Sequence, residues 1–189
     1  MAGKTTIALT ADQYDELIAT VRSGGVGFRP NDRIATALVI EANLGIRIGD
    51  VVKLKLKDII YDAGRYRLDI IEEKTKKKRT FKVPLPVYQY LQIYALRNEK
   101  TEDDILIDIT VRQIQKHLQK VVDYLDYGNS IGTHSFRKFF ATDIFKASNY
   151  NIRLVQDIMQ HSSVSITQRY IGISDQMIED ALDNHTRLA

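Results

Sequence analysis

NLGIRIGDVVKL, residues 43–54, joins two expected helices and turns the chain between them. The first helix is predicted at 31–44 and ends where Gly45 can adopt the left-handed conformation. A short apolar helix follows. Arg47 lies between the two helices, where side chains are often half buried, and a buried arginine needs an anionic partner. Asp50 is a candidate partner within the chain and a phosphate is a candidate from outside, so both interpretations are open.

Helical and strand patterns extend from this stretch in both directions. Thr10 and Gln13 form a capping-box pattern ahead of a helix that ends at Gly24. Strands are expected at 58–61, 66–71 and 79–84, with turns at 62–65 and near 74–77. Further helices are expected at 48–52, 87–97, 111–125, 135–147, 152–160, 165–171 and 175–184. The sequence predicts one domain, residues 1–189, that is mainly α with a small three-stranded antiparallel β-sheet (α+β).

Composition limits the class of protein. The chain has 189 residues and 44% of them are hydrophobic, which is enough to bury a core without covalent cross-links. It has no cysteine, which excludes a disulfide framework, a thiolate zinc site and a cysteine nucleophile. No stretch approaches the roughly 20 apolar residues that span a membrane, and the apolar run at the start is too short for a signal peptide. A soluble, cytoplasmic protein is expected.

Basic residues are clustered more than the net charge of +3 suggests. One group occupies the expected second turn and its strand, and comprises Lys74, Lys76, Lys77, Lys78, Arg79 and Lys82. A second group comprises Lys53, Lys55 and Lys57. Clusters of this kind suit a phosphate backbone, because each contacted phosphate releases condensed counterions. A solvated hairpin tip and a solvated strand face would give the same pattern, so charge alone leaves both interpretations open.

Two later segments carry polar groups suited to chemistry. In THSFRK, residues 133–138, His134 and Arg137 share one face of a helix that Thr133 or Ser135 would cap, a plausible anion site. Ordinary surface residues would also produce this pattern. In QHSSVSITQRY, residues 160–170, His161 precedes a small polar turn and Tyr170 lies on the next short helix. Tyrosines there are usually packing residues, and the chain has ten of them.

Taken in order, these segments resemble the signature of the tyrosine recombinase (phage integrase) family. Its pattern is an arginine after a glycine and an apolar residue, a hairpin lysine, His-x-x-Arg, a histidine or tryptophan, and a tyrosine some nine residues on. The matching positions are Arg47, Lys74, His134, Arg137, His161 and Tyr170. The resemblance covers nearly the whole chain from Leu9. Gln160 departs from the usual glycine and Phe136 from the commoner leucine, and Lys76, Lys77 and Lys78 compete with Lys74 for the lysine's place.

The resemblance implies a role for each matching residue. Arg47 and Arg137 would hold the non-bridging oxygens of a phosphodiester, since the planar guanidinium fits them in bidentate fashion. Tyr170 would attack, leaving a 3′-phosphotyrosyl link and a 5′-hydroxyl. Lys74 would be the general acid for the leaving oxygen. His134 would accept a proton or hydrogen-bond the phosphate, and His161 would hydrogen-bond the phosphate and orient the site.

The resemblance also implies partners and alternatives. Neither ATP nor a metal cofactor is expected, and the sequence has no P-loop pattern and no compact carboxylate cluster. The partner would be double-stranded DNA, contacted by Lys76, Lys77, Lys78 and Arg79. The apolar stripe of the last helix, Met177, Ile178, Ala181 and Leu182, would either pack on its own core or couple protomers into a tetramer on DNA. A type IB topoisomerase and a catalytically silent DNA-binding regulator are the alternative functions, and the family's separate N-terminal domain is expected to be absent or removed.

Overall fold

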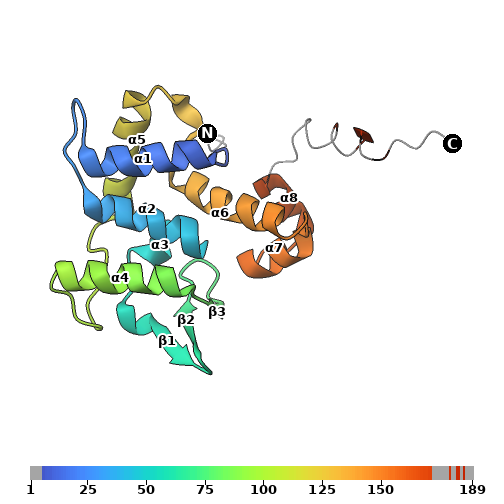
Figure 1. Cartoon of the computed structure of the whole chain (residues 1–189), viewed down its shortest axis with the longest axis horizontal. Coiled ribbons are helices and arrows are strands. Elements are labelled where there is room, and N and C mark those ends of the chain that lie inside the picture. Colours follow the sequence, from blue (N-terminus) through green and yellow to red (C-terminus); the bar gives the residue numbers. More distant parts are fainter. Residues whose placement is uncertain (1–5, 172–178, 180–181, 184, 186–189) are drawn as a thin grey trace. The chain divides into compact units, whose positions relative to one another are not determined.

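The computed structural model describes residues 6–171, 179, 182–183 and 185. Figure 1 labels the elements along the chain. The helices are α1 (Ala11–Ser23), α2 (Asp32–Leu44), α3 (Ile48–Val51), α4 (Leu85–Arg97), α5 (Val111–Tyr124), α6 (Thr133–Ala147), α7 (Ile152–Met159) and α8 (Val164–Ile171). The strands are β1 (Ile59–Asp62), β2 (Arg65–Ile71) and β3 (Lys78–Lys82), and short 3₁₀ helices are η1 (Leu56–Asp58) and η2 (Gly128–Ser130). The α+β class predicted from the sequence is confirmed.

The chain forms two compact units, residues 1–140 and residues 141–189. The first unit holds α1 to α5, the sheet and the start of α6. The second holds the end of α6 with α7 and α8. Each unit is therefore described by itself.

Side-chain caps fix where the helices begin. Thr10 accepts a hydrogen bond from the backbone N–H of Gln13, and the Gln13 side chain accepts one from the backbone of Thr10. Thr110 and Gln113 repeat this arrangement at α5. Asn31 caps α2 through a 3.0 Å bond from the Ile34 N–H. These bonds satisfy backbone donors that the first helical turn leaves open, so the starts expected from the sequence are confirmed.

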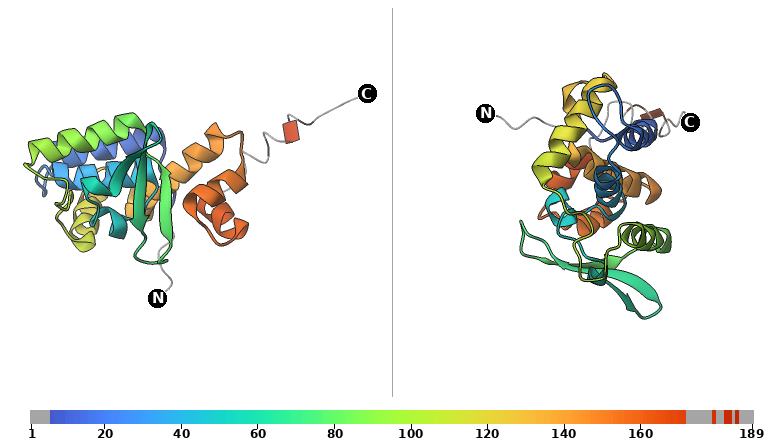
Figure 2. Two further views of the ribbon diagram at one scale, coloured as in Figure 1. Left: turned by 90° about the horizontal axis from the view of Figure 1, so that it is seen from below. Right: turned by 90° about the vertical axis from the view of Figure 1, so that its left-hand side faces the viewer.

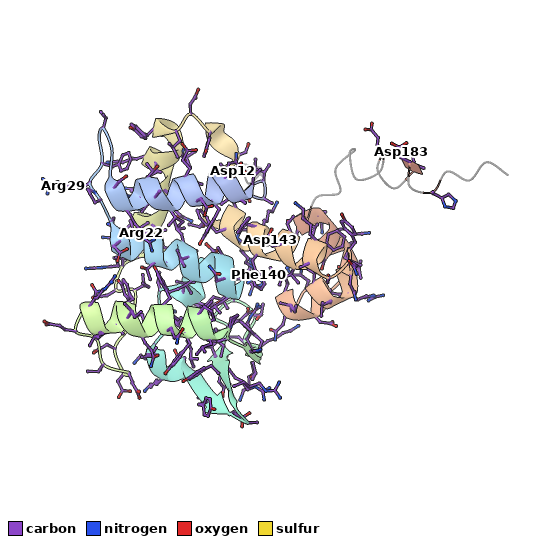
Figure 3. The ribbon with its side chains drawn as sticks, viewed as in Figure 1. Asp12, Arg22, Arg29, Phe140, Asp143 and Asp183 are labelled. Carbon is purple, nitrogen blue, oxygen red and sulfur yellow. The ribbon has the colours of Figure 1, made fainter. Side chains whose placement is uncertain are left out.

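The core of the first unit lies between α1, α2 and α5. Fully or almost fully buried apolar side chains there include Leu17, Val21, Leu38, Ile40, Leu118 and Val122. At the rim, Arg22 of α1 pairs with Asp32 of α2 at 3.1 Å and donates to the Tyr90 hydroxyl of α4 at 2.8 Å. Figure 3 labels Arg22 near α1 and α2. The helices thus pack through apolar faces and carry polar links at their edges.

The sheet is an antiparallel meander in the order β1-β2-β3. Leu68 of β2 is buried in the core, and Tyr66 and Ile70 are partly buried against it, as the two-residue period of a half-buried strand requires. The Tyr66 ring stacks on Tyr88 of α4, with centroids 3.7 Å apart. The right-hand view of Figure 2 shows the sheet as a layer beside α4. This packing leaves the β2–β3 turn, which contains Lys74, at one end of the sheet.

Several predicted boundaries need correction. Asp58 belongs to η1, because its side chain accepts from the Lys55 N–H at 2.8 Å, so the first strand starts one residue later. β3 ends at Lys82, since Pro84 already starts the turn into α4. The helix expected at 135–147 begins at Thr133. Thr133 is therefore the first helical residue, and Ser135, two residues later, accepts from the Gly132 N–H just before the helix at 3.2 Å.

Most of the last expected helix, 175–184, and three residues of its apolar stripe, Met177, Ile178 and Ala181, lie outside the described residues. The fourth, Leu182, is exposed. Within the described part of the chain, none of the helices combines the length and the apolar character that crossing a bilayer requires.

Candidate active site

The turn after α2 brings two buried arginines together. Gly45 ends α2 in the left-handed conformation, with φ 56° and ψ 23°, as predicted. Its carbonyl oxygen accepts a hydrogen bond from Arg79 at 3.2 Å and another from Arg137. Both guanidinium side chains are about 1% exposed. The carbonyl oxygen of Gly45, which lies two residues before Arg47 in the chain, therefore holds the guanidinium groups of both Arg79 and Arg137.

Arg47 is held by a carboxylate that the sequence analysis did not select. Its side chain is 22% exposed, and its guanidinium lies 2.5 Å from Glu72 Oε2. The half-buried position and the need for an anionic partner are confirmed. The candidate partner Asp50 does not fill this role, and its Oδ1 accepts instead from the Glu73 N–H at 2.8 Å. Asp50 thus links α3 to the residue before Lys74.

Glu72 is completely buried between two arginines. Oε2 accepts from Arg47, and Oε1 accepts from Arg79 at 3.0 Å. Burial acts to raise the pKa of Glu72, but a hydrogen bond from Thr75 and the charges of Arg47 and Arg79 bring it below the usual value. Glu72 is therefore a carboxylate at neutral pH.

Arg79 belongs to this buried cluster. Burial, followed by the nearby charge of Arg137, lowers the pKa of Arg79 to about 10. Its side chain is 1% exposed and bonded to Glu72 and Gly45, so in the described conformation it belongs to the buried cluster and not to the surface that the neighbouring lysines form. Charge clustering in the sequence did not reveal that Arg79 points inward, and its expected contact with DNA stays a prediction.

The lysines of the β2–β3 turn lie at the surface. Lys74, Lys76 and Lys77 are exposed, and Lys76 has a positive φ of 56° that closes the turn. Lys78 begins β3 and pairs with Asp69 of β2 at 2.9 Å. The turn therefore presents positive charge to solvent at one end of the sheet, directly after buried Glu72.

His134 and Arg137 lie in the first turns of α6, three residues apart as predicted. His134 keeps an exposed surface while Arg137 is buried. Loss of hydration, followed by the positive charges of Arg137, Lys138, Arg47 and Lys74, lowers the pKa of His134 to about 4. The imidazole is therefore neutral at physiological pH and can accept a proton or donate a hydrogen bond.

Glu41 is a second buried acid of this region. It is 0% exposed on α2, and burial raises its pKa well above the usual value, although the charge of Arg137 acts against that shift. The pKa of Glu41 is therefore shifted up and that of Glu72 down, because Glu72 accepts hydrogen bonds from Thr75 and from two arginines.

The second unit brings the remaining two predicted residues together. α7 ends at Met159, and Gln160 adopts the left-handed conformation with φ 53° and ψ 37°. The rings of His161 and Tyr170 are 4.9 Å apart and inclined by 63°. His161 Nδ1 is also 3.0 Å from the hydroxyl of Thr167, which is buried on α8. The histidine ring therefore has a fixed plane beside the tyrosine.

The first unit thus contains Arg47, Lys74, His134 and Arg137, and the second contains His161 and Tyr170. Sequence reasoning missed Glu72, Glu41 and Thr167. Two signals were available: an acid two residues before the hairpin lysine, and a threonine one helical turn before the tyrosine. The described residues contain no group of three or more potential metal-binding side chains.

Comparisons with known proteins identify similar sequences and similar folds. The model of the "Phage integrase family" matches residues 8–177. The "Tyrosine recombinase XerA" of Pyrococcus furiosus is 24% identical over 184 residues, which cover 93% of this chain and 60% of that protein. The chain therefore spans less than two thirds of the length of this relative.

Solved structures share the fold. The catalytic domain of bacteriophage HP1 integrase has a TM-score of 0.64 and 18% identity, and the match covers 95% of each chain. The XerH site-specific recombinase, crystallised on its difH substrate before cleavage, has a TM-score of 0.69 and 19% identity over 96% of this chain and 55% of XerH.

Proposed function

Because the chain belongs to the phage integrase family, we propose that it is the catalytic domain of a site-specific DNA recombinase. The observation that carries the proposal is that one turn positions both signature arginines, Arg47 and Arg137. Arg137 donates to the carbonyl of Gly45, and Gly45 lies two residues before Arg47 in the chain. Fixed guanidinium groups suit the growing negative charge of a phosphodiester under attack, because they need no reorganisation during the reaction. Residues 1–189 would form one catalytic domain.

The proposed reaction is a reversible transesterification. The Tyr170 hydroxyl oxygen attacks phosphorus, forming a bond to the 3′-phosphate while the bond from phosphorus to the 5′ oxygen breaks. The phenolic proton passes to His134 or to water, and the Lys74 ammonium gives a proton to the departing 5′ oxygen. A 5′-hydroxyl then attacks the phosphotyrosine to rejoin the strand. The covalent link conserves the bond energy, so the cycle consumes no ATP.

The environments of the histidines support these roles. With a pKa of about 4, His134 is a neutral imidazole at physiological pH, which suits a hydrogen bond to the phosphate, and so weak a base makes water the better acceptor for the phenolic proton. The hydrogen bond between His161 and Thr167 holds the His161 ring at one angle to Tyr170. His161 would therefore orient the nucleophile and hydrogen-bond the phosphate.

Double-stranded DNA is the proposed substrate and partner. The DNA-bound XerH neighbour supports it by fold, and the exposed Lys76 and Lys77 of the β2–β3 turn support it by charge. Lys78, although paired with Asp69, is exposed and would add to the same surface. Assembly into a tetramer on DNA through the C-terminal helix would follow the family pattern.

A nicked suicide substrate tests the proposal. Loss of the short fragment beyond the nick traps the covalent intermediate, which appears as a denaturant-resistant protein–DNA adduct. Tyr170→Phe removes the nucleophile and should abolish the adduct while DNA binding persists. DNA binding without an adduct from the unaltered protein would favour the silent regulator. Adduct formation by a monomer that relaxes supercoils would favour the topoisomerase.

A further inference from the structure

Glu72 connects the arginine turn to the lysine turn. Its Oε2 accepts from Arg47 at 2.5 Å and from the Thr75 hydroxyl at 2.8 Å, while Oε1 accepts from Arg79 at 3.0 Å. Thr75 directly follows Lys74. A single carboxylate oxygen therefore binds both the proposed phosphate-binding arginine and the neighbour of the proposed general acid.

The backbone around Glu72 closes the same turn. The Glu72 N–H donates to the Lys77 carbonyl at 3.0 Å, and the Lys76 N–H donates to the Glu72 carbonyl at 2.9 Å. The Thr75 hydroxyl accepts from the Lys77 N–H at 3.4 Å. Lys74 is thus carried by a turn whose two sides both bond to Glu72.

The base of the turn is tied to α3 by the next residue. The Glu73 N–H donates to Asp50 at 2.8 Å, and the Glu73 carboxylate lies 2.7 Å from the Lys53 ammonium. Asp50 is three residues after Arg47. The position of Lys74 is therefore defined against the segment that carries Arg47, with Glu72 as the buried member of the connection.

Stability alone does not account for this arrangement. Burying a carboxylate and a guanidinium costs solvation free energy, and well-packed apolar residues of similar volume are often as stable or more so. Glu72 is 0% exposed and Arg79 is 1% exposed, so both bear this cost. An apolar pair could not accept hydrogen bonds, whereas Glu72 accepts one from Arg47 and one from Thr75 in the lysine turn.

We propose that Glu72, acting through Thr75, is a positioning residue that sets the Lys74 turn relative to Arg47 so that the general acid and the phosphate-binding group reach the same phosphodiester. This inference rests on the proposed function. Loss of the Thr75 link would impair proton donation to the leaving oxygen more than it impairs phosphate binding. The effect therefore depends on the leaving group.

A substrate with sulfur in place of the bridging 5′ oxygen isolates this step. A thiolate leaves without a proton, because thiols have pKa values near 8.5, far below those of alcohols. Thr75→Val removes the hydroxyl but keeps a β-branched side chain, and it leaves Glu72 paired with both arginines. We expect it to slow cleavage of the oxygen substrate by roughly 10-fold or more, part of what a general acid contributes, and that of the sulfur substrate by less than about twofold.

Three variants define the comparison. Lys74→Ala should show the same rescue by sulfur, whereas Arg47→Ala should be impaired on both substrates. Thr75→Ser restores the hydroxyl and should cleave the oxygen substrate at nearly the unaltered rate. Glu72→Ala would leave Arg79 buried and unpaired and is expected to unfold, so Thr75 carries the test. Thermal unfolding of each variant confirms that it is folded.

The outcomes separate the two proposals. If Thr75→Val cleaves both substrates like the unaltered protein, or loses both equally as Arg47→Ala does, the positioning role of Glu72 is overturned while the recombinase function stands. If the unaltered protein forms no adduct with either substrate, the proposed function itself fails, and this inference fails with it.

Discussion

Gly45 faces the ring of Phe140 so closely that a Cβ on Gly45 would lie 2.3 Å from its Cδ1 atom. Figure 3 labels Phe140 beside the end of α2. Gly45 also has φ 56°, which L side chains rarely adopt. Only glycine therefore meets both conditions at the turn whose carbonyl holds Arg79 and Arg137.

Gly45→Ala should destabilise the protein by roughly 2–4 kcal/mol, from left-handed strain of about 1–2 kcal/mol plus overpacking against Phe140. Denaturant unfolding measures the change. Phe140→Ala on the same background should recover part of the loss, because it removes the clash but not the strain. If Gly45→Ala unfolds at the unaltered denaturant concentration, the close approach of Phe140 is contradicted.

His134 should give stability a characteristic pH dependence. Its folded pKa, about 4, lies below the usual value near 6.5, so the unfolded chain binds the proton more readily. The stability that this group contributes is present above pH 6.5 and is lost as the pH falls towards 4. His134→Gln should flatten this part of the curve, measured as the unfolding midpoint from pH 7.5 to 5.

A matched control for that titration is His117→Gln. Burial and the charge of Lys120 also lower the pKa of His117, but the structure gives it no large shift. His117→Gln should therefore change the dependence of the unfolding midpoint on pH less than His134→Gln does. Equal slopes for the unaltered protein and His134→Gln would contradict the depressed pKa.

Much of the fold follows from local signals in the sequence. The capping boxes at Thr10 and Thr110 and the glycine stop at Gly45 each depend on residues a few positions apart, and all three were predicted. The start of α6 was misplaced by two residues, because Ser135 can bond backward from inside the helix as well as cap it. The start of such a helix depends on which of these two hydrogen bonds the serine makes, and the sequence pattern fits both.

The site was less predictable because its cluster depends on contacts between residues distant in the sequence. Arg47 meets Glu72, 25 residues away, rather than nearby Asp50. Arg79 meets Gly45, 34 residues away, and so turns inward from a strand whose neighbouring lysines face solvent. The signature positions came from the family resemblance, and their catalytic roles stay predictions.

Glu41 should make the folded protein less stable as the pH rises. Burial raises its folded pKa, so the folded state keeps the proton more tightly than the unfolded chain. Its contribution is fully present below the unfolded pKa of about 4.3 and is lost as the pH rises through the folded value. Glu41→Gln should therefore raise the unfolding midpoint at pH 8 and have little effect at pH 4. A lower midpoint at pH 8 would show that the charged form is the one the fold stabilises, through Arg137.

Lys76 and Lys77 should account for part of the salt dependence of DNA binding. Changing both to glutamine removes two exposed charges, so the slope of log affinity against log salt should become shallower by about 0.9 for each phosphate that the protein no longer neutralises. Titrations of a DNA duplex at several salt concentrations measure the slope. Lys116→Gln, on the exposed face of α5, is the control and should leave it unchanged. An unchanged slope in the double variant would place the DNA elsewhere.

Gln160 adopts a left-handed conformation at the end of α7, immediately before His161. The strain costs a residue with a Cβ about 1–2 kcal/mol, whereas glycine loses roughly 0.5–1 kcal/mol of backbone entropy on folding. Gln160→Gly should therefore stabilise the protein by about 0.5–1 kcal/mol in denaturant unfolding. Gln160→Ala truncates the side chain but keeps the Cβ, and it should give no such gain. If glycine and alanine have the same effect, the side chain of Gln160 rather than its backbone determines how α7 ends, and the fixed approach to His161 would need another cause.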